Sequence, residues 1–141
     1  METVKQHLEQ HGVRPSVQRI AIMKYLMEHC THPTVDTIYS DLLPELPTLS
    51  RTTVYNTLEL FRQANAAKVL TIDKRNVRYD ACVNPHAHFM CRECGRIFDM
   101  EIDDHLKAHL HDSEHFLIEQ VELNSTGLCE ECQAKMLADK N

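Results

Sequence analysis

Apolar residues recur every three or four positions through much of the first half of the chain, a spacing that indicates amphipathic helices. The pattern predicts helices over residues 13–29, 35–43 and 50–64. Thr34 and Ser50 are suited to cap the second and third helices at their N-termini. Pro44 and Pro47 break the chain between those two helices. This order of elements is typical of a helix-turn-helix.

Alternating apolar and polar residues follow at 67–72 and 77–81, joined by four polar residues. They predict a β-hairpin with a charged tip, as in the wing of a winged helix. Further on, the pattern predicts strands at 88–91, 96–100 and 116–123 and a helix at 103–111. The expected fold class is α+β, with a winged helix-turn-helix domain at 1–81 and a small α/β domain at 82–141. The second domain has a small core, which is expected to require zinc, a partner subunit or both.

Charge is distributed unevenly along the 141 residues, whose net charge is −6. Residues 1–78 hold ten Lys and Arg against eight Asp and Glu, a balance of +2, whereas residues 79–141 hold five against thirteen, a balance of −8. A DNA-binding first half followed by an acidic, metal-binding second half would have this distribution. An acidic half can equally be a solvated surface.

The N-terminal residues lack the charged and apolar blocks of a signal peptide, and no apolar run approaches the roughly 20 residues that span a bilayer. We therefore expect a cytoplasmic protein without membrane contact. In that compartment thiols stay reduced, and paired cysteines are more often metal ligands than disulfides.

Four cysteines form two Cys-x-x-Cys pairs, Cys91 with Cys94 and Cys129 with Cys132. Four thiolates fill the tetrahedral shell of Zn²⁺ and leave no position for water or substrate, so the spacing predicts a structural zinc site. Gly95 suits the tight turn that follows the first pair. A redox pair or two disulfides are the alternatives. Cys30 and Cys82 have no partner motif.

Histidines and aspartates form a second candidate set. Asp80, His86 and His88 lie within nine residues, and Asp99 and His32 lie further away along the chain. Imidazole and carboxylate ligands together suit Fe²⁺, Mn²⁺ or Zn²⁺. Spacing alone leaves open whether these residues bind metal, because a His-x-His on a strand often arises by chance.

Six motifs occur in the order found in one family: residues 12–19 (GVRPSVQR), 32–39 (HPTVDTIY), 50–58 (SRTTVYNTL), 86–88 (HAH), 91–95 (CRECG) and 129–132 (CEEC). The chain thereby resembles the ferric uptake regulator family of bacterial metal-dependent repressors over nearly its whole length. The resemblance implies a homodimer with a winged-helix DNA-binding domain and an α/β dimerisation domain. It also implies that His32, Asp80, His86, His88 and Asp99 form a regulatory Fe²⁺ or Mn²⁺ site between the domains.

The peroxide-sensing branch of the family resembles this ligand set best, because iron-uptake regulators usually have glutamate where this chain has Asp80 and Asp99. In that branch, iron and hydrogen peroxide oxidise a ligating histidine that corresponds to His32 or His86. A further family metal site is not expected, since Gln120 and Leu106 replace its ligands. We expect His105, His109, His111 and His115 to be solvated.

The third predicted helix is the candidate recognition helix, with Arg51, Thr52, Tyr55 and Asn56 placed to reach bases or phosphates. Basic residues elsewhere would contact phosphates: Arg14, Arg19 and Lys68, with Lys74, Arg75 and Arg78. A symmetric dimer predicts a palindromic operator, and the family's operators are A·T-rich.

The sequence thus predicts a repressor, not an enzyme, that senses peroxide. An iron- or manganese-responsive repressor of metal-uptake genes is the alternative within the family. A zinc-dependent hydrolase using His86 and His88 is an alternative of another class, but it would leave the helix-turn-helix unexplained.

Overall fold

The computed structural model describes residues 3–29, 31–81, 87–110, 113–118 and 121–139. The chain divides into two compact units, unit 1 (Met1–Val83) and unit 2 (Asn84–Asn141), and the boundary predicted after residue 81 lies two residues earlier. Cys30 and Cys82 lie outside the described residues. No described helix has the length and apolar character needed to cross a membrane.

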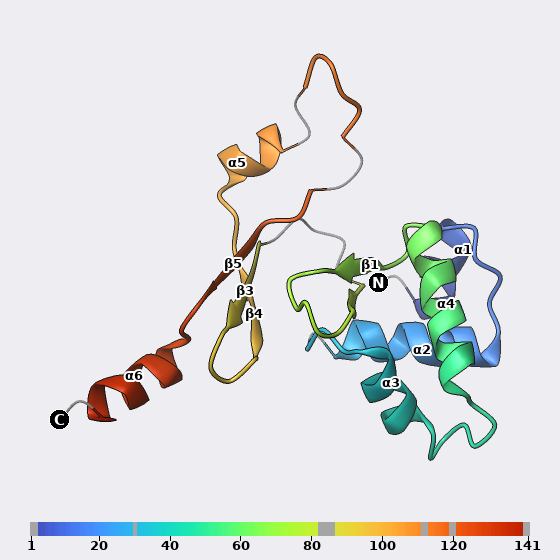
Figure 1. Cartoon of the computed structure of the whole chain (residues 1–141). Coiled ribbons are helices and arrows are strands. Elements are labelled where there is room, and N and C mark those ends of the chain that lie inside the picture. The colour runs from blue at the N-terminus through green and yellow to red at the C-terminus, as the bar shows by residue number, and fades with distance from the viewer. Residues whose placement is uncertain (1–2, 30, 82–86, 111–112, 119–120, 140–141) are drawn as a thin grey trace. The chain divides into compact units, whose positions relative to one another are not determined.

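Unit 1 contains four helices and a hairpin among its described residues: α1 (Val4–Gln10), α2 (Val17–Glu28), α3 (Val35–Leu42), α4 (Arg51–Gln63), β1 (Lys68–Leu70) and β2 (Arg78–Asp80) (Figure 1). The predicted hairpin is confirmed, with Lys68 paired to Asp80 and Leu70 to Arg78 in antiparallel register. Helix α2 begins four residues later than predicted, because Ser16 caps it and Pro15 precedes the cap. Helix α1 was not predicted from the sequence.

The helices form where local hydrogen bonds satisfy their first backbone amides. Ser16, Thr34 and Ser50 each accept a hydrogen bond from the amide three residues later. Thr3 and Gln6 form a reciprocal capping box at α1. One core unites the four helices with the hairpin; its fully buried members include Leu8, Ile22, Met23, Ile38, Val54, Leu58, Phe61 and Tyr79. This packing fixes α4 with one face inward and the other in solvent.

Unit 2 consists of β3 (Ala87–Cys91), β4 (Ile97–Met100), α5 (Asp104–His109), β5 (Asn124–Gly127) and α6 (Glu130–Asp139). Its sheet has the order β4–β3–β5, with β4 antiparallel and β5 parallel to β3. The α+β fold class predicted from the sequence is therefore confirmed. Helix α6 was not predicted, although it begins with two acidic residues that suit a helix N-terminus.

The strand predicted at 116–123 is wrong. The residues described in that range form no strand, and the third strand of the sheet is β5. Phe116 and Leu117 are 74% and 88% exposed, so their side chains do not pack on a sheet face. In β5, Gly127 lies against the Phe89 ring, where an added Cβ would come within 3.4 Å of the ring.

Candidate metal centres and DNA-binding face

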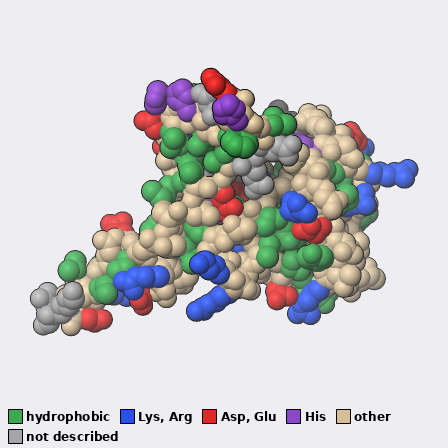
Figure 2. Space-filling model, turned by 45° about the horizontal axis from the view of Figure 1, so that its top comes forward, with side chains coloured by type: hydrophobic (Ala, Val, Ile, Leu, Met, Phe, Trp, Pro, Cys, Tyr) green, Lys and Arg blue, Asp and Glu red, His purple; other side chains and the backbone are tan. Residues whose placement is uncertain are grey.

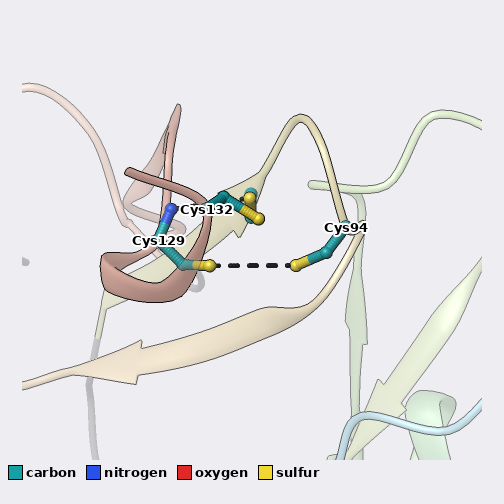
Figure 3. A group of neighbouring side chains, drawn as sticks. Cys94, Cys129 and Cys132 are labelled. Carbon is teal, nitrogen blue, oxygen red and sulfur yellow. Dashed lines mark hydrogen bonds between the residues drawn. The ribbon is translucent and has the colours of Figure 1, made fainter. Parts of the chain in front are cut away.

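The four cysteine thiols of unit 2 form one cluster. Their sulfur atoms lie within 4.8 Å of one another, and those of Cys94 and Cys129 are 3.9 Å apart. Figure 3 shows these two sulfurs facing each other, with the sulfur of Cys132 turned toward the same space. A tetrahedral Zn²⁺ with bonds of about 2.3 Å would hold its sulfurs about 3.8 Å apart. The cluster therefore has the dimensions of a tetrahedral thiolate site.

Two tight backbone segments position these cysteines. Cys91 ends β3, and the chain then turns through Gly95, whose φ of 75° lies in the left-handed region that glycine adopts without strain. The Gly95 amide donates to the Cys91 carbonyl at 2.9 Å. Cys129 precedes α6, and Cys132 lies in its first turn. The parallel pairing of β3 with β5 brings the two segments together.

The electrostatics of the cluster favour a cation. Backbone amides of Cys94 and Cys129 lower the pKa of the Cys91 thiol to about 6. The Arg96 guanidinium lowers the pKa of Cys94. The pKa of Cys132 is instead raised to about 12, first by its hydrogen bond with Cys129 and then by burial. Both effects favour the protonated form of Cys132, whereas a divalent cation bound by the sulfurs would favour the thiolate.

Three of these cysteines also lie in the interior of unit 2. Cys91, Cys129 and Cys132 form its cluster of buried residues, with Phe89 and Leu128 packed against them. Larger apolar side chains such as Phe116, Leu117 and Leu137 are exposed, and hydrophobic side chains are visible at the surface in Figure 2. So small an apolar core supports a fold only with additional stabilisation.

His32 and Asp80 form a buried pair of candidate metal ligands in unit 1. The His32 Nδ1 and an Asp80 carboxylate oxygen are 3.9 Å apart, and the two residues are 2% and 6% exposed. His32 has a φ of 56°, a left-handed conformation that is uncommon for a residue with a side chain. Strand β2 holds it there, since Arg78 donates to the His32 carbonyl at 3.2 Å and the Tyr79 amide donates to the Pro33 carbonyl at 3.0 Å.

His88 and Asp99 form a second pair of candidate metal ligands, in unit 2. They face each other across the antiparallel pairing of β3 with β4, and the His88 Nε2 lies 3.5 Å from an Asp99 carboxylate oxygen. His88 is buried, whereas the Asp99 side chain is 41% exposed. His86, the remaining predicted ligand, lies outside the described residues. Each unit thus carries one imidazole beside one carboxylate.

Sequence comparison identifies the group of proteins to which these features belong. The protein-family model for the "Ferric uptake regulator family" matches residues 10–126. The chain belongs to this family. It is 37% identical over 133 residues to the peroxide-responsive repressor PerR of Staphylococcus aureus, covering 91% of this chain and 88% of that protein.

Two solved structures extend the comparison. The ferric uptake regulator Fur of Helicobacter pylori, described as having three functional metal binding sites, gives a TM-score of 0.72 at 22% identity, covering 92% of this chain and 89% of that one. A structure of PerR from Streptococcus pyogenes, described as the basis of its peroxide sensing and gene regulation, gives 0.53 at 29% identity, covering 94% and 95%. The first likeness concerns the fold alone.

In this family member, the exposed face of α4 carries the residues predicted to contact DNA. Thr52, Tyr55 and Asn56 are exposed, while Val54, Leu58 and Phe61 face the core. This division follows the helical period and leaves one polar face in solvent.

Arg51, the first residue of α4, has partners on α3. Its Nε donates to Asp36 at 2.9 Å, and its guanidinium carbon lies 4.6 Å from the centre of the Tyr39 ring. These contacts hold the arginine at the N-terminal end of α4, where recognition helices approach bases. The sequence did not predict that Asp36 and Tyr39 contact Arg51, although both lie in the family motif at residues 32–39.

The other predicted phosphate contacts differ in their surroundings. Arg14 and Lys68 are exposed, and Arg19 donates to the Arg14 carbonyl at 2.9 Å. Lys74 and Arg75 are exposed between β1 and β2, but Arg78 binds Asp73 at 3.1 Å as well as the His32 carbonyl. Arg78 thus supports the segment that carries His32.

The histidines expected to be solvated lie mostly on or near α5. His105, His109 and His115 are exposed, as is Leu106 at 46%. The rings of His105 and His109 contact each other edge to face, with centroids 4.7 Å apart. His111 and Gln120 lie outside the described residues.

Proposed function

We propose that this chain is a homodimeric, metal-dependent transcriptional repressor that detects hydrogen peroxide through iron. The observation that carries the proposal is the presence of two His–Asp pairs, His32 with Asp80 and His88 with Asp99, in a chain 37% identical to a peroxide-responsive repressor. Both carboxylates belong to aspartates, which is the feature that favoured the peroxide-sensing branch on sequence grounds.

The cysteine cluster is proposed to hold a structural Zn²⁺. Its four sulfurs lie within 4.8 Å of one another, close enough to surround one Zn²⁺, and four thiolates would fill the tetrahedral shell. Such a site supports the fold and leaves sensing to other residues. Zinc and manganese are bound by solved relatives, since a PerR structure of 30% identity is described as PerR-Zn-Zn and a Pseudomonas aeruginosa Fur structure contains manganese.

The regulatory site is proposed to consist of His32, Asp80, His86, His88 and Asp99, which together bind one Fe²⁺ or Mn²⁺. Two aspartates and three imidazoles form a mixed oxygen and nitrogen donor set that suits these ions. His32 and Asp80 belong to unit 1, and His88 and Asp99 to unit 2. Shared coordination would therefore fix the angle between the units, and with it the angle between the two recognition helices of a dimer.

Fe²⁺ bound there would supply the one-electron chemistry that converts hydrogen peroxide into an oxidant of a ligating imidazole. The target would be His32 or His86; the His32 ring is buried, and the Arg78 and Tyr79 hydrogen bonds fix the backbone that carries it. An oxidised imidazole is a poorer ligand. Loss of the His32 contact would release unit 1 from unit 2, and the two DNA-binding units would no longer match the operator spacing.

On DNA, Thr52, Tyr55 and Asn56 are proposed to reach base edges from α4, with Arg51 held at its N-terminal end. Tyrosine can contact a thymine methyl, and asparagine can pair with adenine. Arg14, Arg19 and Lys68 would contact phosphates, which position the protein without reading sequence. The partner is then an A·T-rich palindrome in double-stranded DNA.

The affinity of a His32→Ala variant for A·T-rich palindromic DNA, measured with and without Mn²⁺, tests the proposal. We expect the variant to lose the Mn²⁺-dependent part of its DNA affinity while keeping its zinc. His115→Ala, which removes an exposed imidazole, should behave as the wild type. Unchanged Mn²⁺-dependent binding in His32→Ala would contradict the proposal, and loss of its zinc would show that the two metal sites are not separate.

A further inference from the structure

Arg96 joins the two cysteine pairs of unit 2. Its Nε lies 3.3 Å from the Cys94 sulfur, and its Nη2 lies 3.7 Å from the Cys129 sulfur. The same Nη2 donates to the Glu131 carboxylate at 2.5 Å. Arg96 follows the first Cys-x-x-Cys, whereas Glu131 lies inside the second. One guanidinium therefore contacts a sulfur from each pair while a carboxylate anchors it.

The contact with Cys94 lies at the accessible side of the cluster. Cys91, Cys129 and Cys132 are buried, but Cys94 is exposed. A small oxidant in solution would therefore meet the Cys94 sulfur first. The guanidinium of Arg96 occupies space beside that sulfur and donates a hydrogen bond to it.

Oxidation of Cys94 by a peroxide requires a free lone pair on its sulfur. The thiolate attacks one peroxide oxygen, the S–O bond forms and the O–O bond breaks; the products are a sulfenic acid and hydroxide. Sulfur is oxidised and the peroxide is reduced. A second thiolate of the cluster can then displace hydroxide from the sulfenic acid to form a disulfide, and the metal loses two ligands.

A guanidinium hydrogen-bonded to the thiolate opposes the first step. It engages the lone pair that would attack, and its positive charge draws electron density away from the sulfur. A planar guanidinium can contact both sulfurs and the carboxylate together, which a compact ammonium cannot.

We propose that Arg96, anchored by Glu131, protects the cysteine site against peroxides by slowing oxidation of the Cys94 thiolate. This inference rests on the proposed function in one respect, that the four cysteines hold zinc. In a chain that also senses peroxide, this protection would direct oxidation to the histidine site, because the exposed Cys94 accepts a hydrogen bond from a cation.

The test uses the full-length protein loaded with one zinc per chain and no iron. Hydrogen peroxide is added, zinc release is followed with a chromogenic chelator, and the Cys94 sulfenic acid is trapped and weighed by mass spectrometry. Arg96→Gln should raise both initial rates on the order of tenfold, the factor expected for one hydrogen bond to a charged group. Arg96→Lys should fall between the wild type and Arg96→Gln.

Arg92→Gln is the matched control. Arg92 also follows a cysteine of the first pair and is exposed, but it pairs with Glu93 at 3.1 Å. We expect Arg92→Gln to release zinc at the wild-type rate. Equal acceleration in both Gln variants would overturn the proposal, because net charge alone would then account for it.

A rate in Arg96→Gln at or below that of the wild type would also overturn it. If Arg96→Gln does not hold zinc before oxidant is added, Arg96→Lys decides, and a wild-type rate there refutes the role of the two-sulfur contact. A wild-type protein that binds no zinc would instead contradict the zinc assignment, which keeps the two failures distinct.

Discussion

His32 shows how much a single residue's role depends on contacts that lie far along the chain. Its left-handed backbone is maintained by Arg78, which is 46 residues away and donates to its carbonyl. The resemblance to a family predicted His32 as a ligand, but its conformation depends on the register of β2. The spacing of the cysteines, by contrast, was informative by itself, because two Cys-x-x-Cys pairs supply all the ligands that zinc needs.

Arg78→Met should weaken Mn²⁺ binding although Arg78 is not a proposed ligand. The change removes the hydrogen bond to the His32 carbonyl and the ion pair with Asp73, so His32 is held less firmly. Residues that support metal ligands typically contribute about tenfold or more to affinity. We expect a loss of that order in calorimetric titration. Arg75→Met, in the exposed tip of the same hairpin, should titrate as the wild type, and equal losses in both variants would contradict this role.

Individual elements were predicted well where their signals are local. Ser50 and Thr34 mark helix starts because a cap needs only residues within one turn. The Thr3 and Gln6 capping box is a similar local signal for α1. The strand prediction at 116–123 was wrong because a strand also needs a partner strand, and β3 pairs with β5 instead. Pairing between distant segments is not encoded in local periodicity.

The contact between α2 and α3 gives a prediction about stability. The Tyr25 hydroxyl donates to the Asp41 carboxylate at 2.5 Å, and burial followed by this bond raises the pKa of Tyr25 to about 12. Tyr25→Phe should lower the free energy of unfolding by about 1 kcal/mol at neutral pH, the usual worth of such a hydrogen bond. Chemical denaturation measures the loss.

The pH dependence of that loss has a definite sign. The folded-state pKa of Tyr25 lies above the value of 10.0 expected in the unfolded chain, so its contribution is complete below pH 10 and declines as the pH rises toward 12. The difference between wild type and Tyr25→Phe should therefore be constant between about pH 6 and 9. A difference that varied strongly across this range would show that another group controls the contact.

The whole molecule combines two units stabilised in different ways. Unit 1 has an extensive apolar core, whereas the buried cluster of unit 2 consists of cysteines. The sequence anticipated this difference, since the second half contained too few elements to form a large core. No local pattern in the sequence indicated that the two His–Asp pairs share one metal, and that proposal came from the family resemblance.

Removal of zinc should unfold unit 2 and leave unit 1 folded. Structural zinc contributes about 10–16 kcal/mol in small domains, more than a small core can replace. Hydrogen exchange after treatment with a strong chelator should show lost protection in β3 and β4 and retained protection in α2 and α4. Retained protection in β3 and β4 would show that the cysteine site is not needed for the fold.

The central claim is that bound iron directs peroxide to a ligating histidine. It is tested most directly by exposing the Fe²⁺-loaded and Mn²⁺-loaded proteins to micromolar hydrogen peroxide and weighing their histidine-containing peptides. The account predicts the mass of one added oxygen on the peptide with His32 or His86 in the iron form, with loss of DNA binding, and no change in the manganese form. An iron form without added oxygen on either histidine would contradict peroxide sensing and favour a repressor that responds to iron or manganese supply.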